Sequence, residues 1–540
     1  MSTTPKVSEE AGLVVGEATT STFLFASTLE KCPSKYDYLR VKSKEVVHGK
    51  LVEVDVLAQV DKVFSASDAL KHLVSFDALR RIKEAGIDDL KVYGQARVLG
   101  YIPDTKEPVV LVPRRSLVPG TEVTIAPKDL LQAFYAYPPK ESLVVGSLIT
   151  RPEVEVSLAV SGLRRHLAII AQTGAGKSYC AGVLIEELLE KGGTVLIVDP
   201  HADYVMLGMD SRGSRHLLSD RCKVFRNPAS TGRYSSKDVG NIEEYTIAFS
   251  DLTDDEVYEV AGVQEGFTRI RATLTHALET LRDSGSAYNP SDLTNQLQLG
   301  LDNASSQSDR SDFESALRYA RVVQSMKVFG NTSTPMTRIL GPMQISTLDL
   351  SGLDQVSMDY IVSKLLREVY SEVVSEQFAH PVFVIVEEAH NFIPADKATR
   401  SSPIIKRIAG EGRKFGIFLV VITQRPSKIN SDTLSQCNSQ IIMKLTNPVD
   451  KRAVVESSER MSLELLEDLP GLNPGEAVIL GPVAKTPVMI KIRPRRTREG
   501  GADIDVVKAL EEARKSVAVA TKIREDRDKT EPFSGSFEER

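Results

Sequence analysis

Cysteine and long hydrophobic runs are both scarce in this chain of 540 residues. The four cysteines lie far apart and form no CxxC pair, which excludes a zinc ribbon or a disulfide scaffold and is typical of a reducing compartment. No apolar run approaches the ~18 residues that a membrane-spanning helix needs. The N-terminus MSTTPKVSEE also lacks the apolar core of a signal peptide. We therefore expect a cytoplasmic protein with no membrane partner.

An excess of positive charge is also absent. Aspartate and glutamate outnumber lysine and arginine by 73 to 67, which gives a formal net charge of −6. This excludes attraction to nucleic acid through overall charge, so such a partner must meet a local basic surface. Hydrophobic residues make up 41% and charged residues 26%, which is typical of a globular protein and excludes wholesale disorder. The length predicts about three to four domains.

The first part of the chain, residues 1–137, has the pattern of an all-β domain. Short apolar stretches such as 51–56 and 108–112 alternate with turn residues such as those at 118–120, which predicts a small barrel or sandwich. The alternative, in which these strands join one large sheet with the following segment, stays open. Two consecutive prolines at 138–139 mark a linker.

An α/β pattern begins near residue 140. A strand at 166–170, a helix at 178–190 and a strand at 194–198 form a βαβ unit. Further continuous apolar strands are expected at 382–386, 417–422 and 440–445. Runs that are apolar on both faces are typical of a parallel sheet covered by helices. We therefore predict an α/β core formed by residues 140–205 and 341–490.

Residues 206–340 interrupt this core as a predicted helical insertion. Thr253 and Glu256 have the spacing of a capping box, and apolar residues follow at helical spacing. The polar segment 302–312 is expected to be a loop. The last segment, 491–540, carries 13 basic and 11 acidic residues, and we expect it to lie on a surface or on a neighbouring subunit.

A glycine-rich turn with the sequence AQTGAGKS (171–178) separates the first core strand from its helix. It matches the phosphate-loop pattern GxxxxGK[ST] except that Ala171 replaces the first glycine. Such a turn directs backbone N–H groups at phosphates from a helix N-terminus. Lys177 is expected to contact the β- and γ-phosphates and Ser178 to hold Mg²⁺, so ATP and Mg²⁺ are the predicted cofactors. The alternative is an ordinary βα turn. The expected nucleotide-binding residues are Thr173, Gly174, Ala175, Gly176, Lys177, Ser178 and Tyr179.

Polar residues follow three other core strands. Glu387 and Glu388 come after the strand 382–386, at the edge where ligands bind in parallel sheets. Glu387 is expected to orient Mg²⁺ through water, and Glu388 to polarise the attacking water. Asp199 is a candidate for ordering Mg²⁺ or the water, and Gln424 for sensing the γ-phosphate. The alternative for the two glutamates is a solvated acidic turn.

Basic residues are concentrated between 391 and 430, where eight basic residues meet two acidic ones. Arg413 in this segment, and Arg165 twelve residues before Lys177, are candidate arginine fingers, which stabilise transition-state charge when a neighbour supplies them. A solvated basic loop is the alternative for Arg413. Lysine and arginine side chains are also suited to contacts with the phosphates of a nucleic acid. The remaining candidates for such contacts are Arg400, Lys406 and Arg407.

Taken in order, these motifs resemble those of the HerA family, archaeal hexameric DNA translocases of the FtsK–HerA group. The resemblance covers most of the chain and rests on LRRH before TGAGKS, DPHADY, ISTLDLS, VIVEEAHNF, EGRKFG and TQRPS, and continues through LSQCN and PGEA. The family pattern usually has DPHGEY, so Ala202 and Asp203 depart from it. Asp199 can be carried over from the family, whereas the role of Asp203 stays open.

The resemblance implies an N-terminal HAS-type barrel shared with rotary ATP synthase subunits, a RecA-like P-loop motor, and a C-terminal tail that braces the next subunit. It implies a homohexamer around double-stranded DNA, working as an ATP-driven translocase or helicase. The implied partner is a NurA-like nuclease, in DNA end resection for double-strand break repair. Arg165 and Arg413 match arginines at or near the ATP interface, and which acts in cis stays open. The alternative function is a P-loop motor that moves protein in secretion or conjugation.

Overall fold

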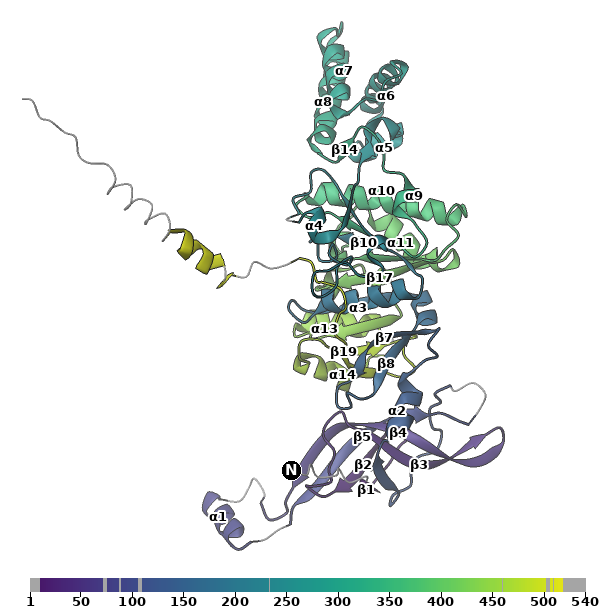
Figure 1. Ribbon diagram of the computed structural model, residues 1–540, viewed down its shortest axis with the longest axis vertical. Helices are drawn as coiled ribbons and strands as arrows, with labels where there is room; N and C mark the ends of the chain where they lie inside the picture. The colour runs from purple at the N-terminus through teal and green to yellow at the C-terminus, as the bar shows by residue number, and fades with distance from the viewer. Residues whose placement is uncertain are drawn as a thin grey trace, which may run out of the picture.

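The structure is a computed structural model that describes residues 10–70, 75–86, 89–104, 109–232, 234–458, 460–501, 506–507 and 509–517. Three parts follow one another along its long axis: a β-barrel, a large α/β core, and a group of helices that projects from the far end (Figure 1). None of the described helices has the length and hydropathy needed to cross a lipid bilayer.

The N-terminal part is a closed barrel with the strand order β1-β2-β5-β4-β3-β6. Its strands are β1 Glu10–Val15, β2 Thr22–Ser27, β3 Tyr38–Val47, β4 Lys50–Ala66, β5 Lys91–Tyr101 and β6 Glu122–Ile125. Side chains alternate between interior and surface along the strands, and Phe23, Phe25, Leu39 and Val41 are fully buried inside. Of the predicted alternatives, a barrel separate from the core sheet is confirmed.

Two helices belong to this part. Helix α1 (Phe76–Glu84) lies on the arm between β4 and β5, and none of its residues is buried. Helix α2 (Lys128–Tyr135) buries Leu131, Phe134 and Tyr135 at the junction with the core. The ammonium group of Lys485 donates to the carbonyl oxygens of Ala133 and Ala136 at the end of α2. The barrel is therefore fixed to the core through both packing and hydrogen bonds.

The core is built on a twelve-stranded sheet with the order β12-β11-β15-β10-β16-β17-β9-β18-β19-β20-β7-β8. Neighbours from β12 to β18 pair in parallel, and the pairs from β18 to β8 are antiparallel. The parallel strands are β9 Leu167–Ile170, β10 Thr194–Asp199, β11 Cys222–Arg226, β12 Asn241–Glu244, β15 Ile345–Asp349, β16 Val382–Val386, β17 Ile417–Thr423 and β18 Ser439–Met443. The antiparallel strands are β7 Ser142–Leu148, β8 Glu155–Ala159, β19 Glu476–Leu480 and β20 Val488–Ile492. The predicted α/β class is confirmed, and the expected strands correspond to β9, β10, β16, β17 and β18.

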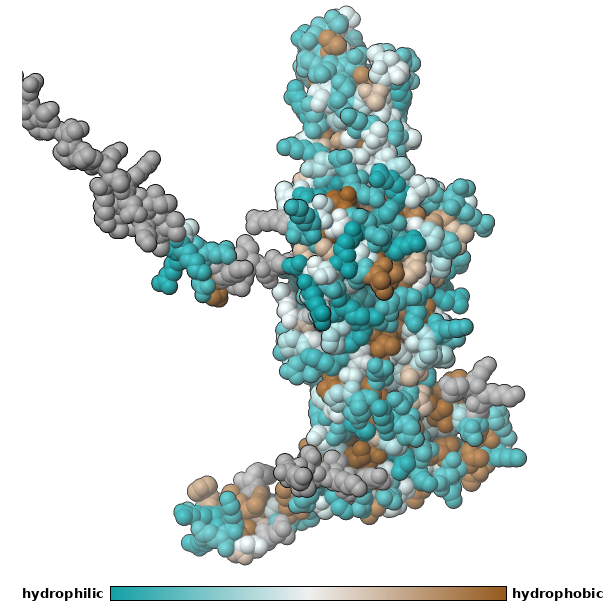
Figure 2. All heavy atoms as spheres, viewed as in Figure 1, coloured by the Kyte–Doolittle hydropathy of each residue, from teal (hydrophilic) through white to brown (hydrophobic). Residues whose placement is uncertain are grey.

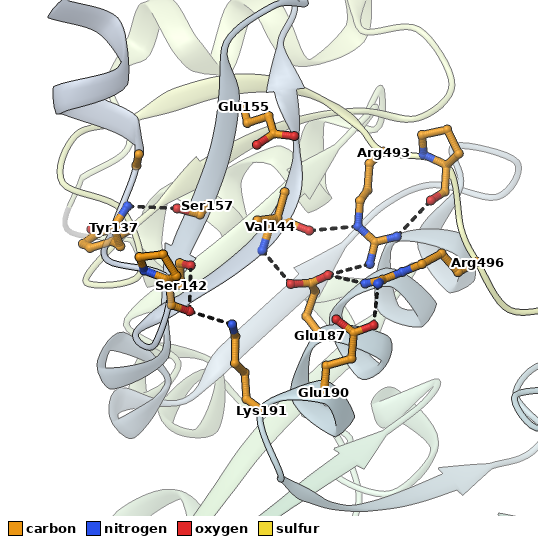
Figure 3. Close-up of a pocket in the computed structure, with 13 residues that line it drawn as sticks. Tyr137, Ser142, Val144, Glu155, Ser157, Glu187, Glu190, Lys191, Arg493 and Arg496 are labelled. Atoms are coloured by element: carbon orange, nitrogen blue, oxygen red, sulfur yellow. Dashed lines mark hydrogen bonds and ion pairs between the residues drawn. The ribbon is translucent and has the colours of Figure 1, made fainter. Parts of the chain in front are cut away.

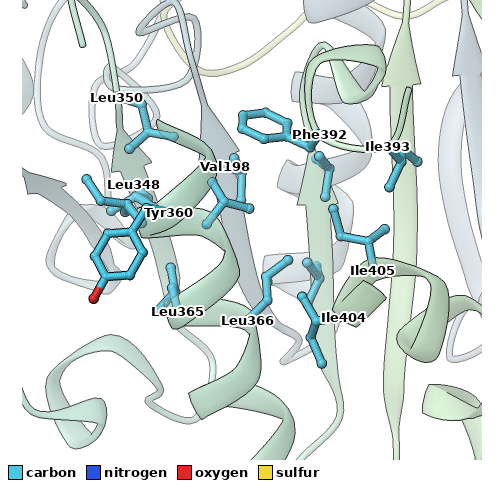
Figure 4. Packing of buried hydrophobic residues seen from close by; sticks show 14 of the residues in the cluster. Val198, Leu348, Leu350, Tyr360, Leu365, Leu366, Phe392, Ile393, Ile404 and Ile405 are labelled. Atoms are coloured by element: carbon cyan, nitrogen blue, oxygen red, sulfur yellow. The ribbon is translucent and has the colours of Figure 1, made fainter. Parts of the chain in front are cut away.

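Helices cover both faces of the sheet. On one face, Leu366 of α10 and Ile405 of α11 pack near Val198 of β10 (Figure 4). On the other face, α3 buries Leu184 and Leu188. The core helices are α3 Lys177–Glu190, α4 Ser236–Val239, α9 Met336–Ile339, α10 Gln355–Val374, α11 Ser402–Glu411, α12 Ser431–Gln436, α13 Pro448–Ser457 and α14 Leu463–Asp468. Short 3₁₀ turns lie at η1 Val160–Arg165, η2 Ser219–Arg221, η3 Phe249–Asp251, η4 Ala389–Asn391, η5 Gly412–Lys414, η6 Pro426–Lys428 and η7 Leu469–Gly471.

The helical insertion is shorter than the predicted segment 206–340, because β11 and β12 from that segment pair into the core sheet. The projecting helices are α5 Asp254–Ala261, α6 Thr268–Asp283, α7 Pro290–Asp302 and α8 Gln307–Ser325, above the small sheet of β13 (Ile247–Ala248) and β14 (Phe329–Gly330). The capping box of Thr253 and Glu256 is confirmed at the start of α5. The loop expected at 302–312 is wrong in its second half, since the Ser306 hydroxyl caps α8.

The segment 493–501 packs against α3 instead of leaving the core. Arg493 and Arg496 form ion pairs with Glu187, and they line a pocket of about 570 Å³ between α3, β7 and the barrel linker (Figure 3). Arg495 passes so close to Gly182 that an added Cβ would lie 2.5 Å from its guanidinium. The predicted tail 491–540 therefore begins later, after Gly501. Much of it lies outside the described residues, and the helical residues 509–517 stand clear of the body (Figure 1).

Candidate active site

The phosphate-loop residues lie at the carboxyl edge of the parallel sheet, between β9 and α3. Gly174 and Gly176 have φ angles of 78° and 98°, which L side chains rarely adopt, so both glycines are required by the turn. Ala171 has no positive φ and is fully buried at the end of β9. Its departure from the pattern therefore leaves the shape of the loop intact.

Lys177 forms the centre of the site. Its ammonium group donates to Glu387 Oε1 and, at 2.6 Å, to Glu388 Oε1, and its side chain is 7% exposed. Burial alone would lower the pKa of Lys177, but the two carboxylates outweigh burial and raise it. The lysine is therefore charged, and two of its three N–H donors are committed to carboxylates.

Glu387 ends β16 and is fully buried. Its Oε2 accepts a hydrogen bond of 2.8 Å from the Tyr204 hydroxyl, while Oε1 faces Lys177. Burial raises the pKa of Glu387, and Lys177 opposes that rise. Such a carboxylate depends on its cationic partner, because an unpaired buried charge is costly.

Glu388 follows in a left-handed conformation with φ 46° and ψ 47°, a backbone strain of the kind that collects at functional sites. Its Oε1 accepts from Lys177 and, at 2.5 Å, from Gln424 Nε2. Burial opposes ionisation, but Lys177 lowers the pKa of Glu388 overall. Its buried Oε2 accepts no hydrogen bond among the described residues, and His390 Nδ1 lies 3.2 Å away. An ionised oxygen in this position can accept a proton from water.

Gln424 connects Glu388 to the phosphate loop. Its Oε1 accepts a hydrogen bond of 2.5 Å from the Thr173 hydroxyl, and its amide nitrogen donates to Glu388. The loop and the acidic pair are thus joined through Gln424 at the end of β17, the candidate for sensing the γ-phosphate.

The carboxylate of Asp199 is surrounded by backbone N–H groups of the turn that follows β10. Its carboxylate accepts backbone hydrogen bonds from His201, Asp203 and Tyr204, at 3.3, 3.0 and 2.9 Å. It is fully buried, and burial raises its pKa well above the usual range. Asp199 therefore holds the turn after β10, and its role in ordering Mg²⁺ or water stays a prediction.

The turn held by Asp199 supplies two site residues that sequence reasoning missed or left open. The Ser178 hydroxyl donates to Asp203 Oδ2 at 2.8 Å, and Tyr204 contacts Glu387. Gly500 N donates to the Asp203 carbonyl oxygen at 3.1 Å, which ties the segment 493–501 to this turn. The position of the turn after a core strand was the available signal, but the departure from the family pattern obscured it.

Arg165 and Arg413 lie at the opposite edge of the sheet. Each precedes a strand, β9 and β17 respectively, whereas Lys177 and Gln424 follow those strands. The seven residues of β17 span about 23 Å and the four residues of β9 about 13 Å, and both lengths are beyond the reach of an arginine side chain. Both arginines are exposed, and neither side chain has a hydrogen bond or ion pair within the described part of the chain. They cannot serve the phosphate loop of their own chain.

Two of the predicted DNA contacts are engaged within the fold. The Arg400 guanidinium donates to the carbonyl oxygens of Glu259 and Val260 and so anchors α5. Arg407 pairs with Glu411 at 2.6 Å and lies over the ring of Tyr370. Only Lys406 of these three candidates is left exposed without such a contact among the described residues.

Comparisons with known proteins identify relatives along nearly the whole chain. A family model for the central domain of the helicase HerA matches residues 143–369. The DNA double-strand break repair helicase HerA of Pyrococcus furiosus is 30% identical, over 90% of this chain and 92% of that protein. A probable helicase of Methanocaldococcus jannaschii is 29% identical over 93% of this chain and 94% of that protein. The solved structure of the bacterial conjugative coupling protein TrwB has a TM-score of 0.46 at 14% identity, covering 69% of this chain and 93% of that one.

Substitution of Lys177 tests the buried ion pair. Lys177→Met leaves Glu387 buried without its cation, which costs about 3–5 kcal/mol of folding free energy. The double variant Lys177→Met/Glu387→Gln removes the charge of the fully buried Glu387 but leaves Glu388 without its cation, so it is expected to regain part of the lost thermal stability while binding no ATP. Thermal unfolding and nucleotide binding measure the two effects. Equal unfolding temperatures for the single and double variants would contradict this assignment.

Proposed function

Because this chain belongs to the HerA helicase family, we propose that it is an ATPase that moves along double-stranded DNA as a ring of six identical subunits. The arrangement that carries the proposal is the group of Lys177, Glu387, Glu388 and Gln424 at the carboxyl edge of the sheet, directly beside the phosphate loop. The Lys177 ammonium and the Gln424 amide both donate hydrogen bonds to the Glu388 carboxylate. That set suits hydrolysis of a nucleoside triphosphate.

The residues present fit Mg²⁺-bound ATP. Left-handed Gly174 and Gly176 turn backbone N–H groups toward a phosphate at the start of α3, and the third N–H donor of Lys177 remains for the β- and γ-phosphates. Ser178 would hold Mg²⁺, with Asp203 as its hydrogen-bond partner and Glu387 close to Lys177. Bound Mg²⁺ would neutralise charge on the phosphate oxygens.

Glu388 is the proposed general base. Its Oε2 would accept a proton from the attacking water, and Gln424 would report contact with the γ-phosphate through its link to Thr173. The strained backbone at Glu388 fixes the carboxylate in place before reaction, which is how an active site achieves preorganisation.

The two arginines support assembly of the active site between subunits. Arg165 and Arg413 lie at the amino edge, exposed and unpaired among the described residues, and cannot reach the phosphate loop of their own chain. In a head-to-tail ring, the amino edge of one subunit would face the carboxyl edge of the next. Both arginines would then contact the neighbour's nucleotide, where such a residue is worth ~10³–10⁵ in rate.

The proposed DNA surface lies beside the acidic pair. The loops 394–397 and 425–429 run side by side, joined by a bridge between Pro394 and Ile429 and by the hydrogen bond from Ala395 N to Lys428 O. They expose Lys397, Arg425 and Lys428 without ion pairs among the described residues. These side chains would contact phosphates, next to the strand end that carries Gln424.

A partner nuclease of the NurA type would supply DNA cleavage, and the barrel is its proposed dock. Hydrophobic residues gather on the face of the barrel seen in Figure 2, whereas the helical insertion is mainly hydrophilic there. Large exposed apolar residues of the barrel include Val46, Phe76 and Val112. Exposed apolar groups of this kind favour a protein partner.

The alternative, a motor that moves protein, is not favoured, since the relatives matched along most of the chain are named as DNA double-strand break repair helicases. The two functions differ in what stimulates hydrolysis. Duplex DNA should accelerate a DNA motor and leave a protein motor unchanged.

ATP hydrolysis measured with and without linear duplex DNA tests the proposed function. We expect duplex DNA to stimulate ATP hydrolysis. The variant Lys397→Ala/Lys428→Ala should reduce this stimulation and require a lower salt concentration for it, because phosphate contacts are lost. Lys327→Ala, at an exposed lysine that is neither in these loops nor among the predicted DNA contacts, is the matched control and should keep normal stimulation. A wild-type rate that does not respond to duplex DNA would argue for another substrate.

Mixed rings test the placement of the arginines. Subunits with Arg413→Ala retain Glu388, and subunits with Glu388→Gln retain Arg413, so some interfaces of a mixed ring regain both groups. Each variant alone should hydrolyse ATP slowly, and the mixture should be faster than either. Absence of recovery at every ratio, with mixed rings confirmed by mass, would argue against a trans role for Arg413.

Two truncations test the tail as a brace between subunits. The described tail helix exposes Val506, Val507 and Leu510 at 64%, 69% and 64%, an apolar stripe suited to a neighbouring subunit. Ending the chain after Gly501 should therefore yield smaller species that remain folded and bind ATP. Ending it after Ile492 should also destabilise the fold, since Arg493 and Arg496 pair with α3. Intact rings at low concentration after the first truncation would refute the brace.

A further inference from the structure

His166 lies between Arg165 and β9 and is 2% exposed. Its backbone has φ 57° and ψ 163°, a conformation that residues other than glycine rarely adopt. The imidazole of His166 is therefore buried in the core, whereas the side chain of the preceding residue, Arg165, is exposed. A buried histidine in a strained turn needs a reason, because both features cost free energy.

The imidazole joins the two segments that carry the exposed arginines. Its Nε2 lies 3.1 Å from the carbonyl oxygen of Ala409, near the end of α11 and four residues before Arg413. Its Nδ1 accepts a hydrogen bond of 2.9 Å from Leu419 N in β17, the strand that follows Arg413. One side chain next to Arg165 thus holds both ends of the segment that presents Arg413.

The hydrogen bonds define the protonation state of the ring. Nε2–H must donate to the Ala409 carbonyl, while Nδ1 must be unprotonated to accept from Leu419 N–H. Burial and, less strongly, the nearby charge of Arg413 lower the pKa of His166 to about 4, against the opposing effect of the hydrogen bond to the Ala409 carbonyl. The imidazole is therefore neutral near pH 7, and it satisfies two backbone groups at once.

The surrounding backbone leaves little freedom on either side. Asn438 N donates to the Arg165 carbonyl oxygen at 3.0 Å, which fixes the peptide before His166. At Gly412, an added Cβ would lie 3.1 Å from the Ile417 carbonyl oxygen, so the turn before Arg413 is tight. The spacing between the two arginine segments consequently depends on the imidazole that lies between them.

We propose that His166 is a positioning residue that fixes Arg165 and Arg413 relative to each other, so that both reach the nucleotide of the neighbouring subunit together. This rests on the proposed function, in which both arginines act in trans. His166 touches no nucleotide in this account; it acts through the two guanidinium groups. A misplacement of about 1 Å at such groups can reduce the rate ~10²-fold.

The test uses full-length rings with His166→Phe, which fills the volume but makes neither hydrogen bond, and His166→Asn, which can keep an acceptor for Leu419 N–H. We expect both variants to bind ATP normally and to hydrolyse it slowly. The loss of hydrolysis should be smaller for His166→Asn than for His166→Phe. Adding His166→Asn to an Arg165→Ala/Arg413→Ala ring should cause little further loss, because the groups it positions are already absent. A full additional loss would overturn the proposal.

Mixed rings separate positioning from a structural role. Subunits with His166→Asn have an intact phosphate loop, so mixing them with Glu388→Gln subunits should restore hydrolysis as mixing Arg413→Ala subunits does. Recovery with Arg413→Ala but not with His166→Asn would overturn the positioning role while leaving the proposed function intact. Recovery with neither would overturn the trans assignment of the arginines, and the role of His166 with it. His166→Asn serves both experiments if His166→Phe fails to fold.

Discussion

A single ammonium group, that of Lys177, balances two carboxylates that are both largely removed from water, and the catalytic edge of the sheet is arranged around it. Glu387 is fully buried and can remain ionised only because the lysine and the Tyr204 hydroxyl face it. The same lysine keeps Glu388 ionised and orients it toward Gln424. The contact between Lys177 and Glu388 therefore keeps both groups charged: the ammonium that would bind phosphate and the carboxylate that would activate water.

The length of the parallel strands separates the phosphate loop and Gln424, which follow the strands, from Arg165 and Arg413, which precede them. Residues that follow β9 and β17 form the nucleotide site, and residues that precede the same strands form an exposed pair of arginines. Since the strands are rigid and about 23 Å long at β17, no side-chain motion can bring the two sets together within a subunit. We propose that a neighbouring subunit supplies the arginines. The segment 493–501, packed on α3 and tied to Asp203, places the start of the tail beside the phosphate loop.

The sequence was sufficient for the barrel, for five core strands and for the acidic pair, because each has a strong local pattern: alternation, continuous apolar runs, or a strand end followed by carboxylates. The sequence was insufficient where contacts between residues far apart in the chain determine the structure. Strands β11 and β12 pair into the sheet across the insertion, which no local pattern in 206–340 indicates. Asp199 and Arg400 have residue types that suit a metal or DNA contact, yet their partners are backbone groups brought close by folding. His166 joins residues more than two hundred positions away, and only the structure identifies those partners.

We propose that the nucleotide site is completed by a second subunit of a ring that surrounds duplex DNA. A cryo-electron microscopy structure of the full chain with a non-hydrolysable ATP analogue, Mg²⁺ and linear duplex DNA tests it most directly. We expect Lys177 and Ser178 of one subunit to contact the same nucleotide as Arg165 and Arg413 of the next subunit. We also expect DNA in the central channel beside Lys397 and Lys428. A nucleotide contacted by one chain only, with both arginines facing solvent, would contradict the proposal.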